Sequence, residues 1–133
     1  MILIDASVAL KWYLPEADSD AAIALTDQEL CAPSLILAEV ANGLWRGERL
    51  GHLQPDSVRN GLTTLSEIFS ELTPLDLLLA RASEIGRDLD HPVYDCIYLA
   101  DAERRGVELV TADKRLLRRL AGSAYGHLAK ALS

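Results

Sequence analysis

Short apolar runs alternate with longer segments of helical spacing along the whole of this chain. The apolar runs that predict strands lie at residues 1–5, 30–33, 72–75 and 107–111, and residues 125–132 predict a further edge strand or a docked tail. Strands separated by helices usually pair in parallel, because the helix returns the chain to the end of the sheet where the strand began. The pattern therefore predicts an α/β/α sandwich with a short, largely parallel sheet of four or five strands.

Helix signals fill the intervals between the predicted strands. Segments with helical spacing or helix-boundary residues lie at 7–14, 19–28, 34–50, 55–69, 77–89, 92–105 and 113–120. Ser34 is the expected N-cap of the third segment, since a serine hydroxyl can accept a hydrogen bond from a free N–H of the first turn. Pro92 stands where a first turn should begin, and Gly106 stands where that helix should end.

The segment 34–50 is unusually apolar for a surface helix. It carries two apolar stripes, one of Ile36, Val40, Gly43, Leu44 and Gly47, the other of Leu37, Ala41 and Trp45. A surface helix of a globular protein ordinarily has a single such stripe, which faces the core. The second stripe predicts contact with a second subunit or another protein, and we expect a homodimer.

Composition bounds the class of protein. A chain of 133 residues, 50% hydrophobic and 25% charged, without a linker or internal repeat, predicts one domain over residues 1–133. Cys31 and Cys96 are too few and too isolated for a disulfide framework or a zinc site, which favours a reducing, cytoplasmic location. Residues 1–5 lack the basic leader of a signal peptide, and no apolar stretch has membrane-spanning length. We therefore expect no membrane attachment.

The charge distribution leaves a nucleic-acid partner open. The formal net charge of −7 argues against such a partner when taken alone. Residues 1–100, however, carry six Lys/Arg against sixteen Asp/Glu, whereas residues 101–133 carry seven against four. The carboxy-terminal third is thus locally basic, and charge does not decide the partner.

Four acidic residues stand in distinctive local settings: Asp5 after Ile2-Leu3-Ile4, Glu39 in Leu-Ala-Glu-Val-Ala-Asn, Asp95 in Tyr-Asp-Cys, and Asp113 after Val-Thr-Ala. Asp5 and Asp113 are also suitable N-caps, and Asp95 lies in a first helical turn, where the helix dipole favours an anion. Glu39 is harder to explain structurally, because it lies inside a helix between apolar neighbours. A partly buried carboxylate in such a place is normally paired or bound to a metal.

Together the four acids indicate a metal site. Ligands of open α/β sheets gather outside the carboxyl ends of the strands, and Asp5 and Asp113 each follow a predicted strand. Four carboxylates about 4 Å apart would repel by a few kcal/mol per pair, so they require protonation or a bound cation. Oxygen ligands without histidine or cysteine point to Mg²⁺ or Mn²⁺.

These four segments, in this order, resemble the motifs of PIN-domain ribonucleases, and most closely the VapC toxins of bacterial type II toxin–antitoxin pairs. The resemblance covers essentially the whole chain and implies a PIN-like fold. It implies that Asp5, Glu39, Asp95 and Asp113 bind Mg²⁺ or Mn²⁺ and carry out the cleavage of single-stranded or looped RNA. It also implies a cognate VapB-like antitoxin as partner.

Several neighbours of the four acids are candidates for supporting roles. Ser7 and Thr111 offer hydroxyls that can orient carboxylates, although Thr111 is equally well explained as an ordinary strand residue. Asn42 lies one turn after Glu39 and Arg46 one turn further, so this face can hold Glu39 and meet a phosphate, or can simply be solvated.

A basic strip at helical spacing is the candidate RNA-contacting surface, with an amphipathic surface helix as the alternative. It comprises Lys114, Arg115, Arg118 and Arg119, and Lys11 is a weaker candidate of the same kind. The three histidines match no motif, so we expect them to be ordinary surface or core residues. We expect Cys96 to be a small buried residue.

Other functional classes fit less well. An aspartyl-nucleophile phosphotransferase commonly carries a second carboxylate two residues after the first, and Ser7 stands at that position. A phospho-receiver domain needs a tight acidic pair, which is absent, and a catalytically silent interaction module would have lost acids from the site. Among nucleases, a housekeeping RNA-processing enzyme remains the alternative to a toxin.

Overall fold

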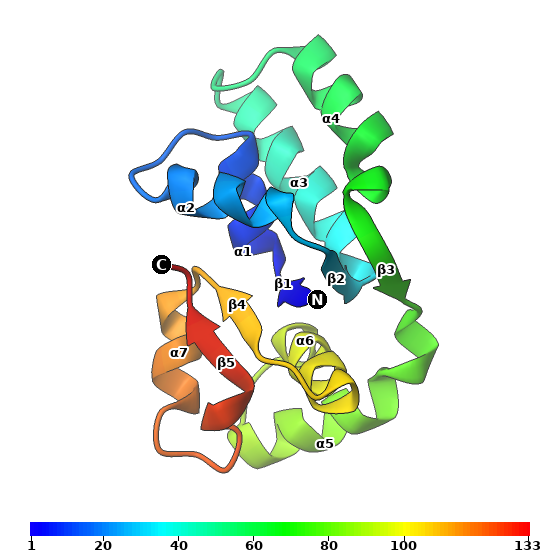
Figure 1. Ribbon diagram of the computed structural model, residues 1–133, viewed down its shortest axis with the longest axis vertical. Helices are drawn as coiled ribbons and strands as arrows, with labels where there is room; N and C mark the ends of the chain where they lie inside the picture. Colours follow the sequence, from blue (N-terminus) through cyan, green and yellow to red (C-terminus); the bar gives the residue numbers. More distant parts are fainter.

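A five-stranded parallel sheet forms the centre of the computed structural model, which describes residues 1–133 (Figure 1). The strands are β1 (Ile2–Ile4), β2 (Leu30–Pro33), β3 (Phe69–Thr73), β4 (Leu109–Thr111) and β5 (Ala129–Ala131). Their order is β3-β2-β1-β4-β5, and every neighbouring pair is parallel. The predicted fold class is confirmed. Of the two alternatives for residues 125–132, an edge strand or a docked tail, the structure has the edge strand, β5.

Seven helices cover the sheet, with α1 to α4 on one side and α5 to α7 on the other (Figure 1). They are α1 (Ala6–Ala9), α2 (Ser19–Ala24), α3 (Leu35–Arg49), α4 (Pro55–Ile68), α5 (Leu79–Leu89), α6 (Val93–Arg105) and α7 (Lys114–Leu120). Single 3₁₀ turns occupy Leu10–Trp12, Leu25–Asp27, Leu75–Leu77 and Gly126–Leu128. This arrangement follows from right-handed crossovers, because the chain moves across the sheet in one direction before β3 and in the other after it.

The ends of α6 agree with the sequence signals. Pro92 precedes its first residue, and Gly106 follows its last with φ of 68°, a left-handed conformation that glycine adopts at little steric cost. No helix has the combination of length and apolar composition that crossing a bilayer requires.

Two local predictions were wrong. The expected strand at 72–75 begins instead at Phe69, whose ring is buried with its centroid 6.3 Å from that of Trp12. This tertiary contact favours the strand conformation at a residue that sequence spacing assigned to the preceding helix. Ser34 makes no side-chain cap; its backbone N–H instead donates to the carbonyl of Thr73 at 2.8 Å.

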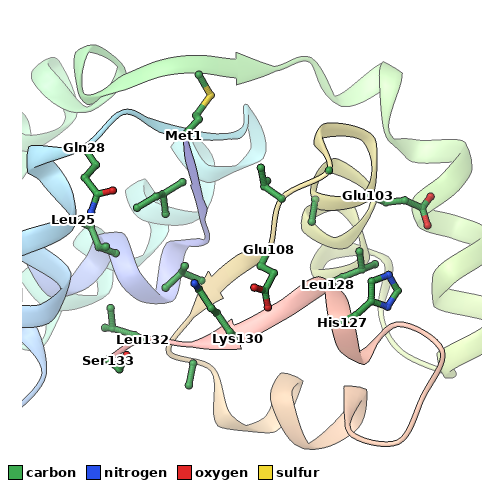
Figure 2. A pocket seen from close by; sticks show the side chains of 16 residues that line it. Met1, Leu25, Gln28, Glu103, Glu108, His127, Leu128, Lys130, Leu132 and Ser133 are labelled. Carbon is green, nitrogen blue, oxygen red and sulfur yellow. The ribbon is translucent and has the colours of Figure 1, made fainter.

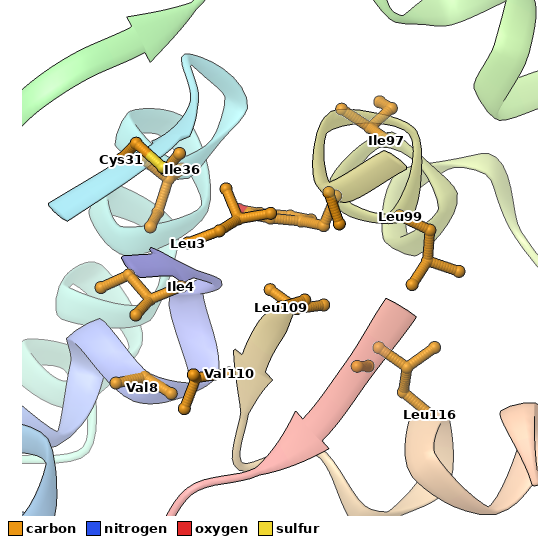
Figure 3. Close-up of a cluster of buried hydrophobic side chains, with 14 of the residues drawn as sticks. Leu3, Ile4, Val8, Cys31, Ile36, Ile97, Leu99, Leu109, Val110 and Leu116 are labelled. Carbon is orange, nitrogen blue, oxygen red and sulfur yellow. The ribbon is translucent and has the colours of Figure 1, made fainter. Parts of the chain in front are cut away.

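The hydrophobic core encloses both central strands. Figure 3 shows side chains of β1 and β4 between those of α1 and α3 and those of α6 and α7. Leu3, Ile4 and Leu109 have no solvent exposure, and burying each such side chain contributes about 1.5–3 kcal/mol. The core therefore holds the carboxyl ends of β1 and β4 in a fixed relation.

Helix α3 presents its two apolar stripes differently. The stripe of Ile36, Val40, Leu44 and Gly47 is buried in the core, as expected. The other stripe is only partly covered, since Leu37 and Ala41 are half-buried and Trp45 is 51% exposed. Arg49 of the same helix lies over the Trp45 ring, 5.7 Å from its centroid, and the rest of the ring is an apolar surface that the single chain leaves exposed.

The strand order reverses between β1 and β4. The chain adds β2 and β3 on one side of β1 and then crosses to add β4 and β5 on the other. Such a reversal opens a crevice at the carboxyl ends of the two strands, where α/β proteins bind ligands. Asp5 directly follows β1, and Asp113 lies two residues after β4.

Candidate active site

Asp5 is buried at the carboxyl end of β1 and is held by two hydroxyl groups, that of Ser7 on α1 and that of Thr111 on β4. Oδ1 accepts hydrogen bonds from the backbone N–H of Ser7 at 3.1 Å and from its hydroxyl at 2.5 Å. Oδ2 accepts a hydrogen bond from the hydroxyl of Thr111 at 2.5 Å. The pKa of Asp5 is raised to about 6, chiefly by burial and to a smaller extent by the nearby charge of Asp113, against the lowering effect of these hydrogen bonds.

Ser7 and Thr111 join the ends of β1 and β4. The Ser7 hydroxyl accepts a hydrogen bond from the backbone N–H of Ala112 at 2.9 Å, and the Thr111 hydroxyl accepts one from Asp113 at 3.0 Å. Each hydroxyl thus donates to Asp5 and accepts from the chain segment after β4. The expected orienting contact between these hydroxyls and a carboxylate is present for both residues.

Asp113 is the N-cap of α7. Its Oδ1 accepts hydrogen bonds from the backbone N–H groups of Arg115 at 3.0 Å and Leu116 at 3.1 Å. Asp5 caps α1 in the same way, through Ser7 and the N–H of Val8. The capping and the site interpretations of these two residues are therefore compatible, because a cap uses only one oxygen of each carboxylate.

Glu39 receives its hydrogen bond from a residue that the sequence reasoning did not select. The hydroxyl of Tyr98, on α6, donates to Oε1 of Glu39 at 2.6 Å, while Asn42 makes no hydrogen bond to Glu39. Burial raises the pKa of Glu39, the Tyr98 hydrogen bond lowers it, and the charge of Asp95 raises it. Tyr98 lies three residues after Asp95, and this helical spacing was the signal that could have identified it.

Asp95 has His91 as its partner. Nε2 of His91, two residues before the start of α6, lies 2.6 Å from Oδ2 of Asp95 in the first turn of that helix. His91 is half-buried, and no sequence motif indicated this contact with Asp95. None of the four acids forms an ion pair with lysine or arginine.

Tyr98 lies among three of the four acids. Its side chain is 2% exposed, and this burial raises the pKa of its phenol far above the ordinary range. The charges of Glu39, Asp5 and Asp95 raise that pKa as well. The charge of Asp113 in turn acts on Asp5. Charge effects thus connect the four predicted acids pairwise or through Tyr98, with Asp5 after β1, Glu39 on α3, Asp95 on α6 and Asp113 at the start of α7.

Comparison with known proteins identifies the family. The PIN domain family matches residues 2–123, which is nearly the whole chain. This chain belongs to the PIN-domain family. Ribonuclease VapC3 of Pyrobaculum aerophilum is 35% identical over 119 residues, covering 86% of this chain and 91% of that protein. Ribonuclease VapC9 of Mycobacterium tuberculosis is 35% identical over 116 residues, covering 87% and 88%. The resemblance to VapC proteins is confirmed.

Solved structures share the PIN fold. A crystal structure of a Pyrobaculum aerophilum protein aligns with a TM-score of 0.62 and 32% identity, covering 92% of this chain and 81% of that chain. A toxin–antitoxin complex from Klebsiella pneumoniae aligns with a TM-score of 0.67 and 16% identity, covering 100% and 97%. The second likeness concerns the fold alone.

The donor set of this PIN domain suits a hard divalent cation. The only buried side-chain oxygen or nitrogen without a hydrogen bond is Oδ2 of Asp101, whose Oδ1 accepts hydrogen bonds from Thr73 and Arg105. The second oxygens of Glu39, Asp95 and Asp113 accept no hydrogen bond from the protein and are therefore open to solvent. Carboxylate oxygens of this kind are what Mg²⁺ and Mn²⁺ prefer, although the acids are not drawn together into a closed cluster of ligands.

A groove of about 490 Å³ runs beside the acids between α1 and α3, and we refer to it as the α1–α3 groove. Glu39, Asn42 and Arg46 line it from α3, as their spacing predicted, and Ser7 lines it from α1. Asn42 and Arg46 are exposed, and their side chains make no hydrogen bond or ion pair within the chain. Both side chains are therefore available to a ligand in the groove.

The predicted basic strip is smaller than expected. Lys114, Arg115 and Arg118 are exposed on α7. Arg119 instead donates hydrogen bonds to the carbonyls of Leu89 and Asp90.

Lys11 is likewise unavailable as a phosphate contact. It forms ion pairs with Glu16 and, at 2.8 Å, with Asp18. The side chains of Lys11 and Arg119, which the sequence suggested as phosphate contacts, are thus bound to other groups within the fold.

A larger cavity, of about 820 Å³, lies away from the acids. It is lined by residues at the start of β1, by the segment before β4 and by β5, including Glu108, His127 and Lys130 (Figure 2). None of the four acids lines it. Its size alone therefore does not mark it as the site of chemistry.

Proposed function

We propose that this protein is a metal-dependent endoribonuclease toxin of the VapC kind, which cleaves single-stranded or looped RNA. The observation that carries the proposal is the grouping of Asp5, Glu39, Asp95 and Asp113 at the crevice between β1 and β4. The similarity to proteins named as VapC ribonucleases supports the same reading.

The open carboxylate oxygens of Glu39, Asp95 and Asp113 would hold Mg²⁺ or Mn²⁺. When bound, such an ion polarises a phosphate and lowers the pKa of a water that can attack it. Asp5 adds negative charge at the same place, and Ser7 and Thr111 keep its carboxylate from rotating. The protein supplies no obvious nucleophilic side chain, so the attacking group is water.

Positive side chains around this centre would bind the RNA backbone. Arg46 lies in the α1–α3 groove, and Lys114, Arg115 and Arg118 project from the helix that Asp113 caps. Phosphate contacts of this kind contribute affinity without selecting a base. The overall negative charge is then compatible with RNA binding, because the basic residues are concentrated near the site.

Two protein partners belong to this proposal. A VapB-like antitoxin would block the RNA-binding crevice, and the exposed Trp45 face of α3 would form a homodimer contact. We place the protein in the cytoplasm with its RNA. A Trp45→Lys variant that sediments like the wild type would remove the support for the dimer contact.

The nuclease is tested with purified protein and structured or single-stranded RNAs, with Mn²⁺ or with EDTA. The wild type should cleave RNA only when the metal is present, and Asp5→Asn should lose most or all of this activity. Asp56→Asn is the matched control, because Asp56 is an exposed acid on α4, paired only with Arg59. Cleavage that persists in EDTA and in Asp5→Asn would overturn the proposal.

Toxin action is tested separately in cells. Expression of the wild type should arrest bacterial growth, and expression of Asp5→Asn should not. Co-expression of a cognate VapB-like antitoxin should relieve the arrest. Normal growth with an active purified nuclease would instead favour the housekeeping enzyme.

A further inference from the structure

Tyr94 is the most exposed of the large hydrophobic side chains and has no partner within the protein. It is 65% exposed, and its hydroxyl makes no hydrogen bond. The hydroxyls of the other three tyrosines donate to Gly61, Glu39 and Asp88. An aromatic ring left uncovered beside a functional site is available to bind a planar ligand.

The position of Tyr94 relates it to the acids. It precedes Asp95 at the start of α6 and lines the α1–α3 groove together with Glu39. The groove's volume of about 490 Å³ is within the range of roughly 300–1,000 Å³ that is typical of small-ligand sites. A group bound against Tyr94 would thus lie next to the proposed scissile phosphate.

The lining of the groove has the composition of a nucleobase site. Its apolar part is formed by Leu10, Leu35 and Ala38, which suit the face of a base rather than a phosphate. Asn42 contributes an amide that can donate to and accept from a base edge, and Arg46 contributes a guanidinium that can bind a flanking phosphate. Proteins that bind single-stranded RNA combine stacking aromatic rings, amides and cations in this way.

From this arrangement we infer that Tyr94 stacks on one unpaired nucleobase beside the scissile phosphate, with Asn42 at the base edge and Arg46 at the adjoining phosphate. The inference rests on the proposed function for its ligand, which is single-stranded RNA. A base can reach the ring only when it is free of its own helix. The site therefore explains a preference for single-stranded or looped RNA over duplex.

Binding is measured without cleavage, by fluorescence anisotropy of short labelled single-stranded RNA oligomers in EDTA. Tyr94→Ala should weaken binding about 5- to 150-fold, as for loss of a base-stacking ring, whereas Tyr94→Phe should bind like the wild type. Val93→Ala is the matched control, because Val93 is the exposed neighbour of Tyr94 and does not line the groove. An abasic oligomer of the same length should bind wild type and Tyr94→Ala equally.

The outcomes separate this inference from the proposed function. Equal binding of the base-containing oligomer by wild type and Tyr94→Ala would overturn the inference. Absence of Mn²⁺-dependent cleavage by the wild type, with binding still dependent on Tyr94, would overturn the nuclease and support the base site. In the cleavage assay, Tyr94→Ala should raise KM with kcat little changed, since stacking contributes to binding in both ground and transition states.

Discussion

The phenol hydroxyl of Tyr98 donates a hydrogen bond of 2.6 Å to Oε1 of Glu39, across 59 residues of sequence. Tyr98 is buried in α6, so the core fixes its hydroxyl and thereby restricts the rotation of the Glu39 carboxylate. The other oxygen, Oε2, is left open to solvent. Preorganisation of a ligand by a neighbour of this kind is a general way in which proteins tune metal sites.

Tyr98→Phe should weaken Mn²⁺ binding about 10- to 100-fold, the usual cost of removing a group that orients a metal ligand. The variant keeps the ring and therefore the packing. The measurement is a Mn²⁺ titration followed by electron paramagnetic resonance, which is independent of cleavage. Tyr13→Phe is the control, since the Tyr13 hydroxyl makes only a 3.5 Å contact with the carbonyl of Gly61. Equal affinities in all three proteins would contradict the role of Tyr98.

Thr111→Val should lower the free energy of unfolding by about 1–3 kcal/mol. The substitution keeps the β-branched shape and removes the hydroxyl that donates to Oδ2 of buried Asp5, which leaves a buried acceptor without its partner. Thr111→Ser retains a hydroxyl and should lose less. Urea unfolding at pH 7 measures both, and equal losses would show that the methyl group matters rather than the hydrogen bond.

The stability of the metal-free protein should fall as pH rises from about 4 to about 6. Burial raises the pKa of Asp5 from 3.8 to about 6, so in this window the folded state holds a proton that the unfolded state has released. The loss saturates near pH 6 at up to about 3 kcal/mol, from 1.36 kcal/mol per pKa unit. Its measurement is the difference in urea unfolding between wild type and Asp5→Asn in EDTA across this range. A difference that does not change with pH would refute the raised pKa.

Arg105→Met should destabilise the fold by about 3–5 kcal/mol. Asp101 has no solvent exposure, and Arg105 donates to its Oδ1 at 3.1 Å, so the substitution leaves a buried carboxylate without its cation. Thr73 remains as a neutral donor at 3.0 Å. Arg104→Met, on the exposed side of the same helix, is the control and should change stability by less than about 0.5 kcal/mol. Thermal unfolding of the two variants side by side decides the point.

Sequence patterns predicted the elements whose signals are local. The apolar run at 30–33 became β2 with the same bounds, and Pro92 and Gly106 bound α6 as expected. These signals work because proline and glycine restrict or free the backbone of their own residue. The start of β3 was missed because the burial of Phe69 depends on Trp12, which no local pattern encodes.

The order of the four acidic segments along the chain was enough to indicate the family and its candidate site. Which strands pair, and hence that Asp5 and Thr111 meet across 106 residues, was decided by the tertiary structure. The same holds for Tyr98, His91 and Tyr94, whose residue types are ordinary and acquire meaning only from what lies beside them. Side-chain chemistry belongs to single residues and can be read one position at a time, whereas burial, distance and shared charge arise only when separate segments pack together.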